Sequence, residues 1–165
     1  MIVVALSPIN DKEDYPMKRI ISIIFMLLCM LLVIILDSGF QGITTFWNAP
    51  SLIIILVITI PMLIFSDNFS DVFRGFQIAM TNREYTSKEL ECSHYAIGLT
   101  IRLIFLSAFF GFLVGGIGIL GNISDPSRIG PSMAVCFLTI YYAAIINIFL
   151  YGIQAKVRKE LIYRK

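Results

Sequence analysis

The chain has 165 residues, of which 58% are hydrophobic and 15% are charged, with a formal net charge of +2 and a mean hydropathy of +0.84. A soluble domain usually has about 45–50% apolar and about 25% charged residues, so these values exclude a soluble enzyme, a disordered tail and a nucleic-acid-binding protein. Because one membrane-spanning helix takes about 20 residues, four spans would use about half of the chain. We therefore expect an all-α polytopic membrane protein with four transmembrane helices.

The first predicted span covers residues 20–36 and follows a short tail, residues 1–19, that ends in Lys18 and Arg19. A signal peptide is the competing interpretation. The apolar run is longer than a usual signal core, however, and no small-x-small cleavage site follows it. We therefore interpret the segment as a membrane span.

The second predicted span covers residues 51–66 and completes a first transmembrane hairpin, residues 20–66. Pro50 precedes it and suits the first helical turn, where no amide donor is needed. Pro61 lies inside it and is expected to kink the helix or to end its regular part.

A 36-residue connection, residues 67–102, follows and is the one connection long enough to have structure of its own. Apolar residues with helical spacing predict an amphipathic helix on the membrane surface or against a neighbour: Phe69, Val72, Phe73, Phe76 and Met80. A turn near Thr81-Asn82-Arg83 would end this helix.

Thr86 and Glu89 form a capping-box pattern, which predicts the start of a second helix. This helix is expected to run through Arg102 into the third span, residues 103–120. We expect Arg102 to extend its charge to the cytoplasmic interface; a place in an ion path is the alternative.

The third span and the fourth, residues 131–153, form a second hairpin, residues 103–153, before a basic tail, residues 154–165. Gly111, Gly115 and Gly118 share one helix face, where the lack of side chains lets another backbone approach. Helix packing alone is sufficient to explain such a row of glycines.

A small and partly polar stripe marks the fourth span, with Thr139, Ala143 and Asn147 at spacings of four. An amide in hydrocarbon needs a partner, because an unpaired one costs several kcal/mol. Contact with another helix is one explanation, and the lining of a hydrated path is the other. Neither the third nor the fourth span contains Asp, Glu, Lys or His, so a proton path would need a carboxylate from another subunit.

The distribution of basic residues predicts the orientation. Of the 13 Lys and Arg residues, all except Arg128 fall in the N-terminal tail, the long connection or the C-terminal tail. The positive-inside rule therefore places both termini and residues 67–102 in the cytoplasm.

The three cysteines give little support for a metal site. Cys29 and Cys136 lie in apolar runs, and Cys92 with His94 would supply at most two ligands. We expect ordinary packing and surface positions instead, and no bound cofactor.

Several segments resemble the MotA/TolQ/ExbB proton-channel family, and the flagellar stator A-subunit in particular. The similar residues are Gly111-Phe-Leu-Val-Gly115, the run Leu120-Gly-Asn-Ile-Ser-Asp-Pro-Ser-Arg-Ile-Gly-Pro131, then Met133-Ala-Val135, Leu138-Thr139, Tyr142, Asn147 and Gln154-Ala-Lys156. The stretch Phe46 to Leu56 is similar to that branch's entry into its second span. Phe112 and Ile140 stand where the family usually has threonines, and the cytoplasmic connection is short.

The resemblance implies a pentamer of such chains in the bacterial inner membrane around two copies of a single-span MotB/ExbD-like partner. Proton or sodium flow past an aspartate of that partner would drive rotation. The last two helices of each chain would line the pore through Thr139, Ala143 and Asn147, while Gly111, Gly115 and Gly118 would allow close packing. Arg83 and Glu84 are candidate cytoplasmic contacts, and membrane lipid surrounds the assembly.

A non-conducting scaffold that has kept the fold and lost the ion path is the rival hypothesis, and Phe112 and Ile140 favour it. A membrane-embedded enzyme has no support in the sequence. No nucleophile–base pair, paired intramembrane carboxylates or phosphate-binding loop is recognisable.

Overall fold

The computed structural model describes residues 48–81 and 85–163, together with the helical positions 21, 24, 25, 28, 29, 32 and 35. The chain divides into two units, residues 1–43 and 44–165, and the helices described below belong to the second unit. The N-terminal tail and most of the first predicted span, residues 20–36, lie outside the described residues. Asn82, Arg83 and Glu84 do so as well.

The described part of the second unit is all-α, as predicted. Its helices are α2 (Ala49–Phe65), α3 (Phe69–Met80), α4 (Ser87–Gly121) and α5 (Pro126–Tyr163). By length and apolar composition α4 and α5 could each cross a membrane, whereas α2 and α3 pass this test only as a pair, bent by 103°. The described part of the chain is thus that of an all-helical membrane protein.

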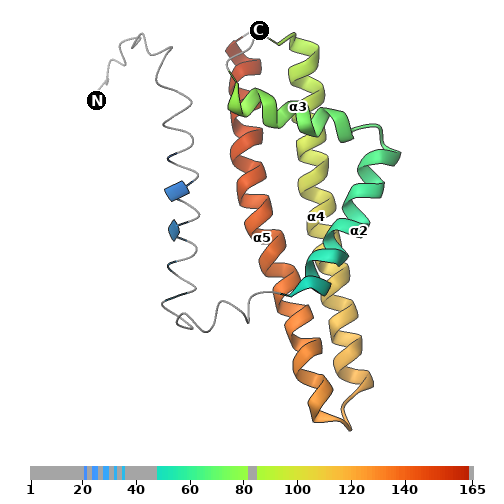
Figure 1. The fold of residues 1–165 in the computed structure, drawn as a ribbon. Helices are drawn as coiled ribbons and strands as arrows, with labels where there is room; N and C mark the ends of the chain where they lie inside the picture. The colour runs from blue at the N-terminus through green and yellow to red at the C-terminus, as the bar shows by residue number, and fades with distance from the viewer. Residues whose placement is uncertain are drawn as a thin grey trace, which may run out of the picture. The chain divides into compact units, whose positions relative to one another are not determined.

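Helices α4 and α5 form an antiparallel hairpin, and α2 leans against it (Figure 1). Helix α3 crosses the hairpin near the end at which α4 begins and α5 finishes. The main buried cluster joins apolar side chains of all four helices: Ile55, Ile78, Leu90, Ile97, Ile101, Ile104, Ala108, Ala143, Leu150, Ile153 and Val157. The core therefore follows the contact between α4 and α5 and continues beneath α3.

Helix α2 begins with a side-chain cap and contains a proline. The side chain of Asn48 accepts a hydrogen bond from the backbone N–H of Ser51 (3.2 Å), and Pro50 lies in the first turn. The helix does not end at Pro61 but continues to Phe65. Polar contact with α4 occurs at Thr59, whose Oγ1 lies 3.3 Å from Oγ of Ser107.

Helix α3 confirms the amphipathic helix predicted from residues 69–80, and it packs against neighbouring helices. Val72, Gly75 and Ile78 are buried, and the ring centroid of Phe76 lies 6.1 Å from that of Phe149 on α5. A hydrogen bond of 3.1 Å from Nζ of Lys156 to the carbonyl of Ala79 joins α5 to the last turn of α3. Figure 1 shows the resulting crossing of α3 over the hairpin.

Helices α4 and α5 are longer than the predicted spans. The capping box of Thr86 and Glu89 is present, and α4 runs unbroken through the exposed Arg102, as predicted. Helix α5 begins at Pro126, five residues before the predicted fourth span, and continues through the basic segment to Tyr163. Val157 is fully buried within that segment.

Candidate ion-pathway hairpin

The glycine row of α4 lies against α5 of the same chain. A Cβ added to Gly111 would come within 2.6 Å of Cγ2 of Thr139. A Cβ on Gly115 would lie 2.6 Å from Sγ of Cys136, and one on Gly118 would lie 2.8 Å from Oγ of Ser132. The three glycines are thus placed at a close contact between two helices, with α5 supplying the neighbouring atoms.

The stripe predicted on α5 divides into a covered part and a partly exposed part. Thr139 is fully buried, with its hydroxyl donating to the carbonyl of Val135, and Ala143 is also buried. Asn147 is partly exposed, but its Oδ1 is buried and has no hydrogen-bond partner among the described residues. An unpaired buried amide oxygen is costly, which makes Asn147 the member of the stripe most suited to meet water, an ion or a partner chain.

The outward side of the hairpin is apolar. Phe112 on α4 and Ile140 on α5, the positions where the resembling family usually has threonine, are 37% and 46% exposed. Phe137, Ile148 and Tyr151 on α5 are more exposed still. This surface is suited to lipid or to the apolar side of a neighbouring subunit.

The sequence segment that carries the family resemblance closes the hairpin. At the end of α4, the side-chain amide of Asn122 donates to the carbonyl of Gly118 (2.8 Å). At the start of α5, Oδ1 of Asp125 accepts hydrogen bonds from the backbone N–H (3.2 Å) and hydroxyl (2.6 Å) of Ser127. Arg128 forms an ion pair with Asp125 at 3.3 Å. The motif therefore has a local structural role, because it satisfies groups at both helix ends.

The candidate cytoplasmic contacts Arg83 and Glu84 lie outside the described residues, shortly before the start of α4.

At the start of α4, Oε2 of Glu89 accepts a hydrogen bond of 2.9 Å from the backbone N–H of Thr86. This bond lowers the pKa of the Glu89 carboxyl below its ordinary value, with further lowering by the Thr86 side chain and by the charge of Arg74. The Glu89 carboxylate thus stabilises the helix start in its ionised form.

The described residues contain no group of three or more His, Cys, Asp or Glu side chains that could hold a metal ion. Cys92 and His94 lie one turn inside α4, and both are partly exposed.

Comparison with known proteins finds short regions of high identity to motility proteins. Motility protein A of Aquifex aeolicus (strain VF5) is 44% identical over 50 residues, 30% of this chain and 20% of that protein. Chemotaxis protein PomA of Vibrio alginolyticus is 51% identical over 37 residues, 22% of this chain and 15% of that protein. Motility protein A of Cereibacter sphaeroides is 54% identical over 35 residues, 21% of this chain and 14% of that protein.

The matched segments span a fifth or less of the length of these curated relatives. No family model matches the chain, and no solved structure matches it. The identity is nevertheless high within the matched segments, and all three relatives carry motility or chemotaxis names. Over these segments the chain is therefore similar to MotA-like motility proteins.

Proposed function

We propose that the chain is a proton- or sodium-conducting subunit of a stator-type motor in the bacterial inner membrane. It would form a pentameric ring around two copies of a single-span MotB/ExbD-like partner, and ion flow would drive rotation or other mechanical work. The similarity to motility protein A and PomA is the observation that carries this proposal. The role is not enzymatic.

The composition of the hairpin supports the view that a partner supplies the titratable group of the ion path. Residues 103–120 and 131–153 contain no Asp, Glu, Lys, Arg or His. A proton relay through a membrane requires titratable groups, so this hairpin cannot supply one alone. We assign the essential carboxylate to an aspartate in the membrane helix of the partner.

Asn147 is the proposed point of contact between this chain and the ion or its water. Its buried Oδ1 has no partner in the described part of a single chain, and assembly with a partner helix or hydration would satisfy it. Thr139 and Ala143 continue the stripe beneath α4. In the proposal they set the separation of α4 and α5 along the pathway, opposite the row formed by Gly111, Gly115 and Gly118.

Ion flux into vesicles tests the proposal. The chain is co-expressed with the single-span membrane protein encoded next to it, and proton or sodium uptake is measured under an imposed gradient. We expect flux with the wild-type partner and background flux when the partner's membrane aspartate is replaced by asparagine. Flux that survives this replacement would refute the mechanism.

The apolar outward face favours a second candidate, a non-conducting scaffold. If Phe112 and Ile140 face the centre of the ring, they seal it rather than hydrate it, since both side chains are exposed in the single chain. Thiol labelling of Ile140→Cys and Asn147→Cys, with the three native cysteines replaced, separates the two functions. A conducting ring labels with a membrane-impermeant reagent at residue 147, whereas a sealed scaffold labels at neither position.

A further inference from the structure

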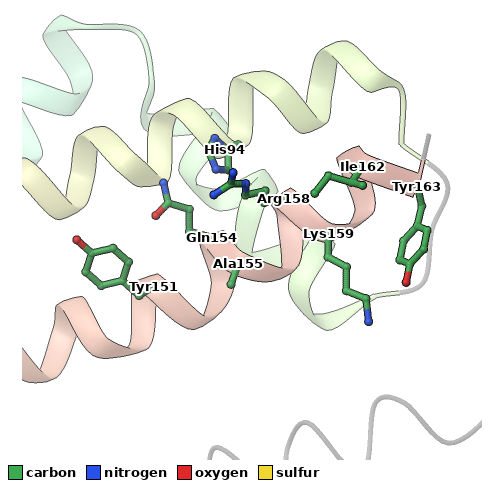
Figure 2. A pocket seen from close by; sticks show the side chains of 8 residues that line it. All are labelled: His94, Tyr151, Gln154, Ala155, Arg158, Lys159, Ile162 and Tyr163. Atoms are coloured by element: carbon green, nitrogen blue, oxygen red, sulfur yellow. The ribbon is translucent and has the colours of Figure 1, made fainter. Parts of the chain in front are cut away.

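An open groove lies on the hairpin beyond the predicted fourth span, at the end where α4 begins and α5 finishes. Its volume is about 560 Å³, and His94 of α4 and one face of α5 line it. Figure 2 shows Tyr151, Gln154, Arg158 and Lys159 along α5, with His94 on α4. The sequence did not predict this groove, because its basic residues were interpreted as a tail, whereas α5 continues through them as a helix.

The groove is formed by regular helix geometry. Tyr151, Gln154 and Arg158 follow spacings of three and four on α5, so their side chains share one face. The lack of a side chain at Gly98 of α4 leaves room for Gln154, because a Cβ at Gly98 would lie 2.8 Å from Nε2 of Gln154. The side-chain amide of Gln154 therefore packs against the backbone of α4.

The groove is electropositive. Arg158 and Lys159 contribute two positive charges, and none of the described residues that line the groove is acidic. Within residues 48–81 and 85–163, the ion pairs involve neither of these two residues nor His94. Nζ of Lys159 lies 5.7 Å from the ring centroid of Tyr163, a cation–π contact that holds the ammonium group at the groove.

The groove lies at the depth of lipid headgroups if α5 spans the membrane as predicted. Arg158 follows the last residue of the fourth span, Ile153, by five residues, which is about 7–8 Å along a helix. The headgroup layer on each side of a bilayer is about 5–8 Å thick. Tyr151, at the edge of the span and 58% exposed, suits the aromatic belt of a membrane protein.

We propose that this groove binds the phosphate group of an anionic phospholipid in the cytoplasmic leaflet. The guanidinium of Arg158 can donate two parallel hydrogen bonds to phosphate oxygens, and the ammonium of Lys159 adds a second positive charge. The amide N–H of Gln154 faces the ester oxygens of the lipid, and Tyr151 contacts the start of an acyl chain. The proposal requires α5 to span the membrane but is independent of ion conduction.

Native mass spectrometry of the full chain in detergent tests this assignment. Phosphatidylglycerol is titrated against phosphatidylcholine for the wild type, for Arg158→Gln combined with Lys159→Gln, and for Arg158→Lys. A matched control, Lys88→Gln combined with Arg128→Gln, removes the same charge from exposed positions that do not line the groove. Circular dichroism and elution volume establish that each variant is folded.

The wild type is expected to retain phosphatidylglycerol in preference to phosphatidylcholine. Because a basic residue near an anionic membrane surface contributes about 1 kcal/mol, the groove double variant should bind phosphatidylglycerol about ten- to thirty-fold more weakly. The control double variant should stay within about two-fold of the wild type, and Arg158→Lys should fall between the two. Equal weakening by the control and groove variants would overturn the proposal, because general charge would then explain binding.

Added inorganic phosphate distinguishes a lipid site from a site for free phosphate. Millimolar phosphate should leave bound phosphatidylglycerol in place, because the lipid also has apolar contacts with Tyr151. Complete displacement by phosphate alone would contradict a lipid site. If the folded groove variant retains wild-type lipid affinity, the assignment is wrong irrespective of the phosphate result.

Discussion

Gly115 and Cys136 lie so close together that a methyl group on the glycine would come within 2.6 Å of the cysteine Sγ. The same methyl group would lie 2.8 Å from the carbonyl oxygen of Ser132 and 2.9 Å from the backbone nitrogen of Cys136. Backbone atoms cannot rotate away as side-chain ends can. Gly115 therefore sets the separation of α4 and α5.

Gly115→Ala should destabilise the hairpin by about 1–3 kcal/mol, since overpacking forces the helices apart. Gly118→Ala should cost less, because its closest atom is the hydroxyl of Ser132, which can rotate. Gly116→Ala is the matched control, as a Cβ there meets nothing within 4 Å. Thermal unfolding in detergent measures the loss of stability in all three variants. Equal losses for Gly115→Ala and Gly116→Ala would contradict this close packing of α4 and α5.

Thr59 and Ser107 connect α2 to α4 through a buried hydroxyl pair 3.3 Å apart. Because Ser107 donates its own proton to the carbonyl of Leu103 (2.7 Å), the hydroxyl of Thr59 is the donor to Ser107. A double-mutant cycle with Thr59→Val and Ser107→Ala should give a coupling of about 0.6 kcal/mol, as measured for such bonds in membrane proteins. A coupling of zero in reversible unfolding would show that the pair is not a hydrogen bond.

Lys156 stabilises α3 by donating to the carbonyl of Ala79, near the negative end of that helix. Lys156→Met keeps the aliphatic stem and removes the donor. We expect faster hydrogen exchange in residues 76–80, with α4 unchanged. Arg158→Met, which removes a charge two residues further along α5, should not alter exchange in α3. Equal exchange rates for α3 in the two variants would contradict the contact.

The lowered pKa of Glu89 predicts that the stability of the folded chain depends on pH. Its pKa is lower in the folded chain than in the unfolded chain, so its contribution is present above the unfolded pKa and is lost as pH falls through the lowered value. The difference in unfolding midpoint between wild type and Glu89→Gln should therefore be present at about pH 7 and shrink towards about pH 3. A difference that does not vary with pH would show that the charge of Glu89 has no role.

The sequence predicted local features of the fold well where short-range chemistry determines them. The apolar spacing from Phe69 to Met80 predicted α3, and the Thr86–Glu89 pattern predicted the start of α4. The extension of α5 was not recognised, although a signal existed. Leu150, Ile153, Val157 and Leu161 continue an apolar stripe with helical spacing into the basic segment, where Val157 is fully buried.

The start of α5 illustrates a limit of hydropathy. The apolar run begins near Pro131, but the helix begins at Pro126 because Asp125 caps it. The sequence also did not predict which helix packs against the glycine row. The spacing placed Gly111 and Gly115 on one face, but tertiary packing alone brings Thr139 and Cys136 of the same chain against it.

Ion flux through vesicles containing the chain and its single-span partner is the measurement that tests the proposed function most directly. With both wild-type proteins we predict flux above background. Asn147→Leu in this chain, or Asp→Asn in the partner's membrane helix, should each reduce it to background while the complex still assembles. Absence of flux in the wild-type complex, or full flux with Asn147→Leu, would contradict the proposed function.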